Sequence, residues 1–468
     1  MPNIHHLLKS VVLFLTVTTW VHAGTLQVQI KNDRMSLQAR NCFLQDILHE
    51  IERQGVKISV DSKFNPQISA SFSNRDLQKG LDSLLKPFSY ILIWKASASP
   101  PGSQLAEIRI FNRGTPAQQS RSPDLAVARN PEDGSFYIKN TIMVRLKAGA
   151  DVAAFKSRLS KINARIVSFH TGSGIYEIRM PENSDTPGWV KRFADFPDVA
   201  HAEPDYAFRS PSLYRYTGFD DAPISFAETD IPKGAAPIAV MDSGLNMDYG
   251  LDNVVLTSLD ASNPHKPITD NNGHGTHMAL IASGLIDPIG GGTQENLANP
   301  IIPIKLFDEN GWSSNAHIIR GIDFALKNGA RVISLSWKTQ NPSAFLKDTL
   351  DYAHSKGVIV IAAAGNEPTG EPVYPAAYPS VTGIGALDPD GKTWQKSNYG
   401  SFVDVQAPGF AIFPTEYEGQ TEMRAGTSIS AAYVANQIAS YLRRHPDASN
   451  EEALEAVKQK RNKGVSPK

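Results

Sequence analysis

The chain contains one cysteine, Cys42, among its 468 residues. No intrachain disulfide can form, so the folded state must be stabilised by the burial of apolar side chains or by a bound ion. An excess charge of either sign is also missing, because 46 lysine and arginine residues balance 47 aspartate and glutamate residues. This balance gives no reason to expect nucleic acid or an anionic lipid surface as a partner.

Long apolar runs are equally scarce. The run at residues 11–17 is too short to span a bilayer, and no later run approaches the required length. Lys9 precedes this run, and the small residue Ala23 follows it at the expected cleavage point. This arrangement is typical of a secretory signal peptide. We therefore expect residues 1–23 to be removed and the rest of the chain to be exported and soluble, in the periplasm or outside the cell.

Three residues of the types that cooperate in nucleophilic catalysis occur in the order Asp, His, Ser. Asp242 ends the apolar run of residues 238–241, which reads as a buried parallel strand with the carboxylate at its C-terminal edge. His274 and Ser428 each open a stretch of apolar residues at helical spacing. A serine hydroxyl is a poor nucleophile until an imidazole takes its proton, and the imidazole needs a carboxylate that fixes its tautomer. We therefore expect the three side chains to converge.

Asn366 and the start of the Ser428 helix offer donors for the oxyanion that forms during acyl transfer. Asn366 follows the apolar strand expected at residues 358–361. Its side-chain amide and the backbone N–H of Ser428, at the positive end of a helix dipole, would stabilise negative charge on a bound carbonyl oxygen. The alternative reading of Ser428 is a plain helix N-cap.

These residues lie in four blocks that resemble the subtilisin-like serine proteases and follow that family's order. The blocks are AVMDSG, NNGHGTH, AAAGNE and GTSISAAYVA, and the resemblance covers about residues 237–442. It implies a doubly wound α/β fold with a parallel sheet, which the alternation of expected strands and helices also favours. It further implies that the orienting carboxylate, the general base and acid, the nucleophile and the oxyanion donor are Asp242, His274, Ser428 and Asn366.

Several positions depart from that family's usual residues. Leu280 and Ala432 stand where the family commonly has Gly and Pro, and we expect the core to repack around them. Trp337 and Lys338 replace the usual Leu-Gly at the strand edge that pairs with substrate. The lysine would close the primary specificity pocket to bulky side chains, favour an acidic one, or bend out into water. His277 is expected to pack rather than to act as the base. The substrate contacts that the resemblance implies are Ser336, Trp337, Lys338, Ala364 and Gly365.

Two further segments precede the catalytic domain expected at residues 210–468. Residues 114–135 are rich in Pro, Gln, Ser and Arg without an apolar period, which predicts a linker. Residues 136–209 show apolar patterns in the α+β order βαββαβ and end in VAHAEPDY. That ending resembles the end of the subtilisin propeptide, which implies an intramolecular inhibitor whose tail lies in the active-site cleft. We expect self-cleavage between residues 206 and 219, and a solvated surface charge is the alternative role for Glu203.

Residues 24–113 predict a separate small α+β domain with the order βαββαββ. Asn41 is expected to cap its first helix and Gly55 to end it. The strands are expected at residues 26–30, 56–60, 68–72, 90–94 and 108–111, and the helices at 44–51 and 77–85. This layout resembles the short N-terminal domain of secretins and TonB-dependent receptors, which implies contact of residues 25–113 with an envelope protein of a double-membraned bacterium. An unrelated small spacer is the alternative.

No cofactor is predicted with certainty, and calcium remains the one candidate. Calcium commonly supports subtilisin-like proteases, but residues 287–293 replace the usual loop and show no constellation of carboxylates. The sequence predicts an exported serine endopeptidase that is made as a self-inhibited precursor and cleaves polypeptides. One alternative, favoured by Leu280, Lys338 and Ala432, is a pseudo-protease that binds extended peptides without cleaving them. The other is an envelope assembly or signalling factor recruited through residues 25–113.

Overall fold

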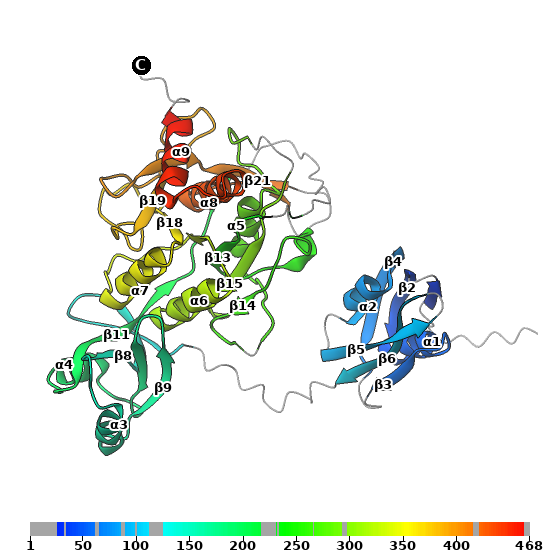
Figure 1. Ribbon diagram of the computed structural model, residues 1–468, viewed down its shortest axis with the longest axis horizontal. Coiled ribbons are helices and arrows are strands. Elements are labelled where there is room, and N and C mark those ends of the chain that lie inside the picture. Colours follow the sequence, from blue (N-terminus) through cyan, green and yellow to red (C-terminus); the bar gives the residue numbers. More distant parts are fainter. Residues whose placement is uncertain are drawn as a thin grey trace, which may run out of the picture. The chain divides into compact units, whose positions relative to one another are not determined.

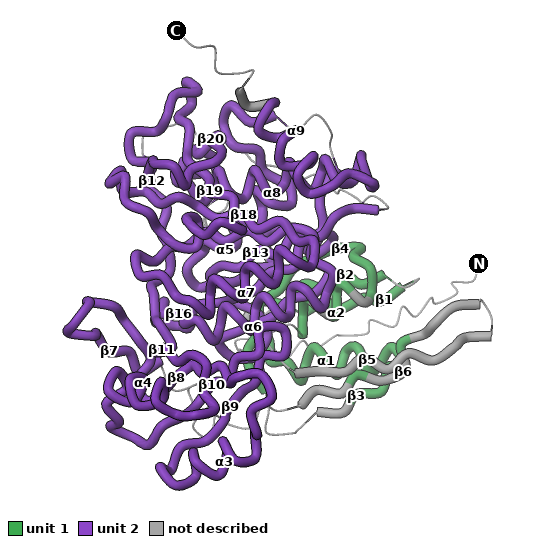
Figure 2. Tube along the Cα trace, turned by 60° about the vertical axis from the view of Figure 1, so that its left-hand side comes forward, with its two compact units in different colours: residues 1–121 green, residues 122–468 purple. Residues whose placement is uncertain are grey.

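The computed structural model describes residues 26–31, 34–60, 65–85, 89–98, 101–111, 125–216, 231, 234–264, 266–292, 297–414 and 421–462. The signal peptide expected at residues 1–23 and residues 114–124 of the expected linker lie outside the described residues. The chain divides into two compact units, residues 1–121 and 122–468 (Figure 2). No helix in the described part of the chain is long and apolar enough to cross a membrane.

The first unit has a core of its own, built from two helices and two small sheets (Figure 1). Its elements are β1 (Leu26–Lys31), β2 (Arg34–Phe43), α1 (Leu44–Glu52), β3 (Lys57–Val60), β4 (Gln67–Asp76), α2 (Leu77–Leu85), β5 (Ser89–Ala98) and β6 (Pro101–Phe111). One sheet has the order β1-β2-β4 and the other β3-β6-β5. Helix α1 buries Leu44, Ile47, Leu48 and Ile51, whose spacing places them on one face of the helix.

The sequence prediction missed strand β2, which is the central strand of its sheet between β1 and β4, and it assigned the wrong cap residue to α1. Residues 34–40 alternate between buried and more exposed side chains, which is the pattern of a half-buried strand. Asn41 lies in this strand, and the N-cap position of α1 is Phe43, without a side-chain cap. The N–H of Leu44 bonds instead to the carbonyl oxygen of Pro66 at 2.8 Å. The observed order is therefore ββαββαββ.

The second unit begins with an antiparallel sheet of order β16-β11-β8-β10-β9, in which β7 also pairs with β8. Its elements are β7 (Val127–Arg129), β8 (Phe136–Leu146), α3 (Val152–Lys161), β9 (Arg165–His170), β10 (Ile175–Arg179), α4 (Thr186–Ala194), β11 (Val199–Arg209) and β16 (Trp312–Ser314). Phe155 of α3 and Phe193 of α4 are buried in its core. Because β7 lies inside the range 114–135, the expected linker ends before Val127.

A parallel sheet of seven strands forms the centre of the second unit, in the order β14-β15-β13-β17-β18-β19-β20. The strands are β13 (Ile238–Asp242), β14 (Leu259–Asp260), β15 (Ile301–Lys305), β17 (Val332–Leu335), β18 (Ile359–Ala363), β19 (Val381–Leu387) and β20 (Val405–Pro408). The main helices are α5 (His274–Ser283), α6 (Asn315–Lys327), α7 (Ala344–Ser355) and α8 (Thr427–Arg444). Strands β13, β15, β17 and β18 are fully buried, which explains their nearly unbroken apolar sequences.

Helices cover both faces of this sheet (Figure 1). In strand β13, Ile238 and Val240 share a core cluster with α5 and α8. Ala239 and Met241, which point to the opposite face, share another cluster with α6 and α7. The doubly wound parallel-sheet prediction is therefore confirmed. The remaining elements are the antiparallel strands β12 (Tyr214–Tyr216), β21 (Phe410–Pro414) and β22 (Thr421–Ala425), the 3-10 helix at Met247–Tyr249 and α9 (Asn450–Asn462).

The C-terminal edge of the parallel sheet brings together the chemistry that the sequence scatters. Strand β13 ends at Asp242, and β17 and β18 lead directly into residues 336–338 and 364–366. Helices α5 and α8 begin at this same edge, with His274 and Thr427 as their first residues. Ligands of open α/β sheets bind at this edge, which makes it the place to expect the functional site.

Candidate active site

Asp242 and His274 form a buried pair. The Nδ1 atom of His274 lies 2.7 Å from Oδ1 of Asp242, and the two side chains are only 3% and 1% exposed. The same carboxylate oxygen accepts the backbone N–H of Ser243 at 2.7 Å. A carboxylate at Nδ1 favours the tautomer that carries its proton there and leaves Nε2 free to accept one. Nε2 is buried and has no hydrogen-bond partner among the described residues.

Ser428 is the second residue of α8 and is also buried. Its hydroxyl donates to the carbonyl oxygen of Ser336 at 3.2 Å. Because the first N–H groups of a helix have no partner within the helix, the backbone N–H of Ser428 is available to a bound acceptor. The residue therefore offers a hydroxyl and a backbone donor at one point.

Asn366 is oriented by Thr427, which the sequence prediction did not single out. Oδ1 of Asn366 accepts both the backbone N–H and the hydroxyl of Thr427, each at 2.9 Å. The hydroxyl oxygen of Thr427 in turn accepts the N–H of Gly365 at 3.1 Å. With Oδ1 engaged in this way, the amide nitrogen of Asn366 is the atom left to donate to a substrate oxygen.

Asp270 ties the turn before His274 to the loop after Asp242. One of its carboxylate oxygens accepts the hydroxyl of Ser243 and the N–H of Gly273, both at 2.9 Å. The other accepts the N–H and the hydroxyl of Thr276, at 2.8 and 2.7 Å. Burial alone would raise the pKa of Asp270, but these hydrogen bonds together lower it by more, so the net pKa lies below 3.8. An aspartate before Asn-Asn-Gly is the signal that could have revealed this residue.

Gly275 lets α5 approach this loop closely. A Cβ atom at this position would lie only 2.4 Å from the carbonyl oxygen of Gly244. No other residue fits there without moving the backbone that carries His274.

The five residues expected to contact substrate have different surroundings in the structure. Ser336 presents its carbonyl to Ser428, and Lys338 forms an ion pair with Glu367. Trp337 is almost fully buried and stacks on Phe208 with ring centroids 4.7 Å apart. The two other predicted contacts are Ala364, which is fully buried, and Gly365, which borders the cavity beside Ser428.

The chain itself passes through this cleft. Strand β11 pairs with β16 as far as Arg209, and the N–H of Ser210 bonds to the carbonyl oxygen of Gly311 at 2.9 Å. Strand β12, which starts at Tyr214, pairs with β22. The residues between the two strands border a cavity of about 300 Å³ together with Ser428. A peptide is thus seated at the proposed nucleophile.

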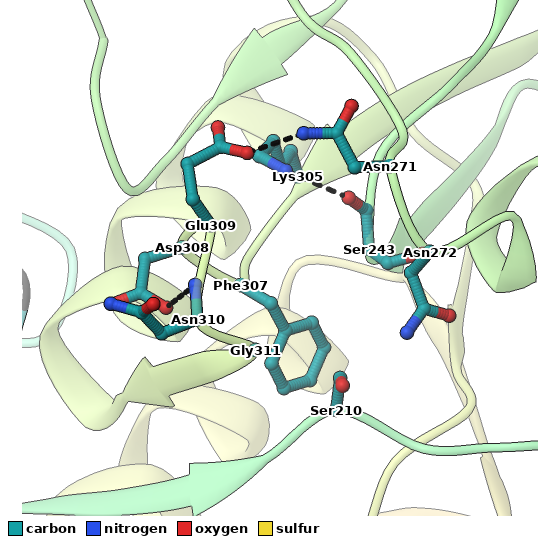
Figure 3. Close-up of a pocket in the computed structure, with 10 residues that line it drawn as sticks. All are labelled: Ser210, Ser243, Asn271, Asn272, Lys305, Phe307, Asp308, Glu309, Asn310 and Gly311. Atoms are coloured by element: carbon teal, nitrogen blue, oxygen red, sulfur yellow. Dashed lines mark hydrogen bonds between the residues drawn. The ribbon is translucent and has the colours of Figure 1, made fainter.

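A second cavity of about 240 Å³ extends the cleft past Ser210, which lies at its border near Phe307 (Figure 3). The buried Lys305 borders it and donates from Nζ to the carbonyl oxygen of Ser243 at 3.2 Å. Asn271 and Glu309 are hydrogen-bonded across its other side. This cavity lies next to the loop that follows Asp242.

Two acidic side chains of β11 accept hydrogen bonds at the N-terminal ends of two helices that cover the parallel sheet. The N–H of Ala344, at the start of α7, donates to Glu203 at 3.1 Å. The N–H of Ala316, near the start of α6, donates to Asp205 at 3.0 Å. Carboxylates are stabilised at helix N-termini. Glu203 is only 6% exposed, so the alternative of a solvated surface charge is wrong.

Comparison with known proteins identifies the fold and its chemistry. Residues 234–466 match the model of the subtilase family, and residues 124–205 match the fervidolysin N-terminal prodomain. A thermophilic serine proteinase of Bacillus sp. (strain AK1) is 32% identical over 284 residues, which cover 58% of this chain and 70% of that protein. This chain belongs to the subtilase family. It is a subtilisin-like serine endopeptidase.

Other relatives agree with this assignment. Subtilisin NAT of Bacillus subtilis subsp. natto is 31% identical over 266 residues, which cover 56% of this chain and 70% of that protein. The crystal structure of fervidolysin from Fervidobacterium pennivorans, a keratinolytic enzyme related to subtilisin, matches with a TM-score of 0.52 and 20% identity. That match covers 68% of this chain and 56% of the fervidolysin chain, and it shows the fold alone.

The remaining departures of this subtilase from the family pattern lie away from the reacting groups. Leu280 and Ala432 are fully buried in the core that α5 and α8 share. His277 stacks on Phe413 with ring centroids 4.2 Å apart, and burial lowers its pKa to about 3, which makes it a poor base. The described residues contain no group of three or more His, Cys, Asp or Glu side chains that could hold a metal ion.

We predict that Asp270→Asn destabilises the turn before His274. The amide would face the N–H and hydroxyl of Thr276 with a donor, and each buried donor left unpaired costs about 1–3 kcal/mol. Urea unfolding of the intact chain, in a Ser428→Ala background, measures this loss. The deficit should shrink as the pH falls from 3.8 through the lower pKa of the folded Asp270, because the wild-type carboxylate loses its charge over that range. Asp388→Asn, in an exposed turn, is the control. Equal losses in the two variants would contradict the special role of Asp270.

We also predict that Asp205 makes the packing of β11 on α6 pH-dependent. Burial, reinforced by the negative charge of Glu177, raises the pKa of Asp205 to about 7 from 3.8. Since the folded state holds the proton more tightly than the unfolded state, the contribution of this group is fully present below pH 3.8 and is lost as the pH rises toward 7.

The loss is at most about 1.4 kcal/mol per pH unit for one group. Thermal unfolding of the Ser428→Ala chain between pH 4 and pH 8 should therefore show a weaker pH dependence after Asp205→Asn, which keeps the acceptor for Ala316. The control is Asp195→Asn, an exposed position of the same domain. If both variants followed the parent curve, the assignment of this pH dependence to Asp205 would be wrong.

Proposed function

We propose that this subtilase hydrolyses peptide bonds through Asp242, His274 and Ser428, with Asn366 as a donor to the oxyanion. The observation that carries the proposal is the 2.7 Å contact between the buried Asp242 and His274, at the sheet edge where α8 presents Ser428. A carboxylate, an imidazole and a hydroxyl at one sheet edge are the three groups that activate a serine, although in this structure the hydroxyl of Ser428 is bonded to Ser336 and not to His274.

The reaction follows from these contacts. Nε2 of His274 takes the hydroxyl proton as Oγ of Ser428 attacks the carbonyl carbon, and Asp242 stabilises the imidazolium. The backbone N–H of Ser428 and the side-chain amide of Asn366 donate to the oxyanion. Nε2 then delivers its proton to the leaving nitrogen, and water releases the acyl group by the same route. Removal of an oxyanion-hole donor costs about 3–4 kcal/mol of transition-state stabilisation in related sites.

We further infer that the protein is made as a self-inhibited precursor and that cleavage occurs between Arg209 and Tyr214. Residues up to Arg209 are held by β16, and residues 214–216 are held by β22. Among the described residues of the expected range 206–219, which end at Tyr216, the stretch between them is the part without strand pairing, and it borders the same cavity as Ser428. This range is narrower than the range 206–219 expected from the sequence.

The expected result is that purified wild-type chain yields two fragments, whereas Ser428→Ala stays intact. Intact mass and sequencing of the new N-terminus measure this, and Ser401→Ala, an exposed serine, serves as the control. Processing of the Ser428→Ala chain as complete as that of wild type would exclude self-cleavage. Failure of Ser428 to react with a fluorophosphonate probe, in processed protein, would favour the pseudo-protease reading instead.

Export and recruitment complete the proposal. The pattern of residues 1–23 supports export, to the periplasm if residues 25–113 contact envelope proteins. What supports a separate recruiting module is that residues 1–121 form a compact unit with its own core. Such a unit can bind a partner without taking part in the chemistry.

We therefore predict that deletion of residues 25–113, with the signal peptide kept, leaves cleavage of a generic peptide intact and abolishes co-sedimentation with envelope membranes. Peptide hydrolysis by the purified variant and fractionation of the producing cells measure the two effects. Co-sedimentation equal to that of the full chain would contradict the recruiting role.

A further inference from the structure

A side chain crosses the slot beside the nucleophile. Strands β17 and β18 are neighbours in the parallel sheet, with Leu335 opposite Ala362. Lys338 lies on the segment that leaves β17, and Gly365 lies on the segment that leaves β18. Both border the cavity of about 300 Å³ that Ser428 also borders. The two segments therefore form facing walls at the point where an attacked residue would place its side chain.

Lys338 reaches from the first wall to the second. A Cβ atom on Gly365 would lie 2.8 Å from Cδ of Lys338 and 3.1 Å from its Cε. The aliphatic stem of the lysine thus lies directly against the Gly365 backbone. Its ammonium group is held by the carboxylate of Glu367 on the same second wall. Lys338 is 27% exposed and so does not bend out into water, unlike Glu367, which is 60% exposed.

The contact between Lys338 and Gly365 decides between the two substrate preferences that a lysine at this position would allow, which are exclusion of bulky side chains and selection of acidic ones. A bulky side chain could enter only by displacing the stem from Gly365 and breaking the ion pair. An acidic side chain would compete with Glu367 for a charge that is already neutralised, and it would be repelled by Glu367 itself. A small side chain leaves both contacts in place.

The peptide that occupies the cleft agrees with this reading. Between the paired strands it presents Ser210, Pro211 and Ser212, three small side chains that border the cavity beside Lys338, and the larger Arg209 and Tyr214 border that cavity from the two strands that flank them.

We propose that the Lys338–Glu367 pair acts as a bar that restricts the residue whose carbonyl is attacked to small side chains. This specificity rests on the proposed function, because it describes the substrate of the same site. It makes small-residue positions of polypeptides, rather than aromatic or acidic ones, the substrate class of the enzyme.

The test uses the full chain after self-processing and dissociation of the domain that carries β11, with active sites counted by a fluorophosphonate probe. Three peptides that differ only by Ala, Phe or Glu at the attacked residue are compared by kcat/KM. We expect Ala to exceed both Phe and Glu by about tenfold or more, the range that pocket fit provides. A higher value for Phe or Glu would overturn the proposal. Absence of both probe labelling and hydrolysis would instead overturn the proposed function.

Two variants separate size from charge. Lys338→Gly removes the bar, and we expect the Phe to Ala ratio of kcat/KM to rise by about tenfold or more. Lys338→Met keeps the length of the stem without the charge, and we expect it to retain the preference for Ala over Phe. An unchanged ratio in the glycine variant, or equal ratios in the two variants, would contradict a steric bar. The wild-type comparison stands without either variant if one fails to fold.

Discussion

The catalytic geometry depends on the attachment of α5 to the loop after β13. The imidazole of His274 is carried by the first residue of a helix, whereas its carboxylate partner ends a strand. Asp270 joins the two by accepting hydrogen bonds from both sides, and Gly275 removes the Cβ that would separate them. A short contact between two buried side chains is maintained only when both backbones are fixed, so this attachment comes before any chemistry.

The groups on the other side of the proposed nucleophile also depend on backbones that are held in place. Ser428 gains its position from the start of α8, and the residue before it, Thr427, holds Asn366 through two hydrogen bonds. The hydroxyl and the proposed oxyanion donor are therefore oriented by consecutive residues of one helix.

The sequence predicted the parts of this molecule whose pattern is local. Strand β13 and the starts of α5 and α8 follow from short apolar runs and a few flanking residues. Strand β2 was missed because its alternation is read correctly only when the neighbouring strands are known. The hydrogen bonds of Asp270 to Gly273 and Thr276 join residues close in sequence, but its bond from Ser243 and those between Thr427 and Asn366 join different elements, and no local pattern records them. Lys338 was noticed, yet only its contacts with Gly365 and Glu367 show that it does not bend out into water.

The contacts of strand β11 show that a cut in the chain after Arg209 would not by itself release the segment in the cleft. Strand β11 belongs to two structures at once, because it pairs with β8 inside its own domain and with β16 at the edge of the cleft. Its buried carboxylates, Glu203 and Asp205, cap helices of the catalytic layer. Cutting the chain after Arg209 breaks none of these contacts. It removes only the tether that kept the local concentration of the inhibitor high. Release of the segment would then require both buried carboxylates to regain water together, which opposes dissociation of the domain that carries β11.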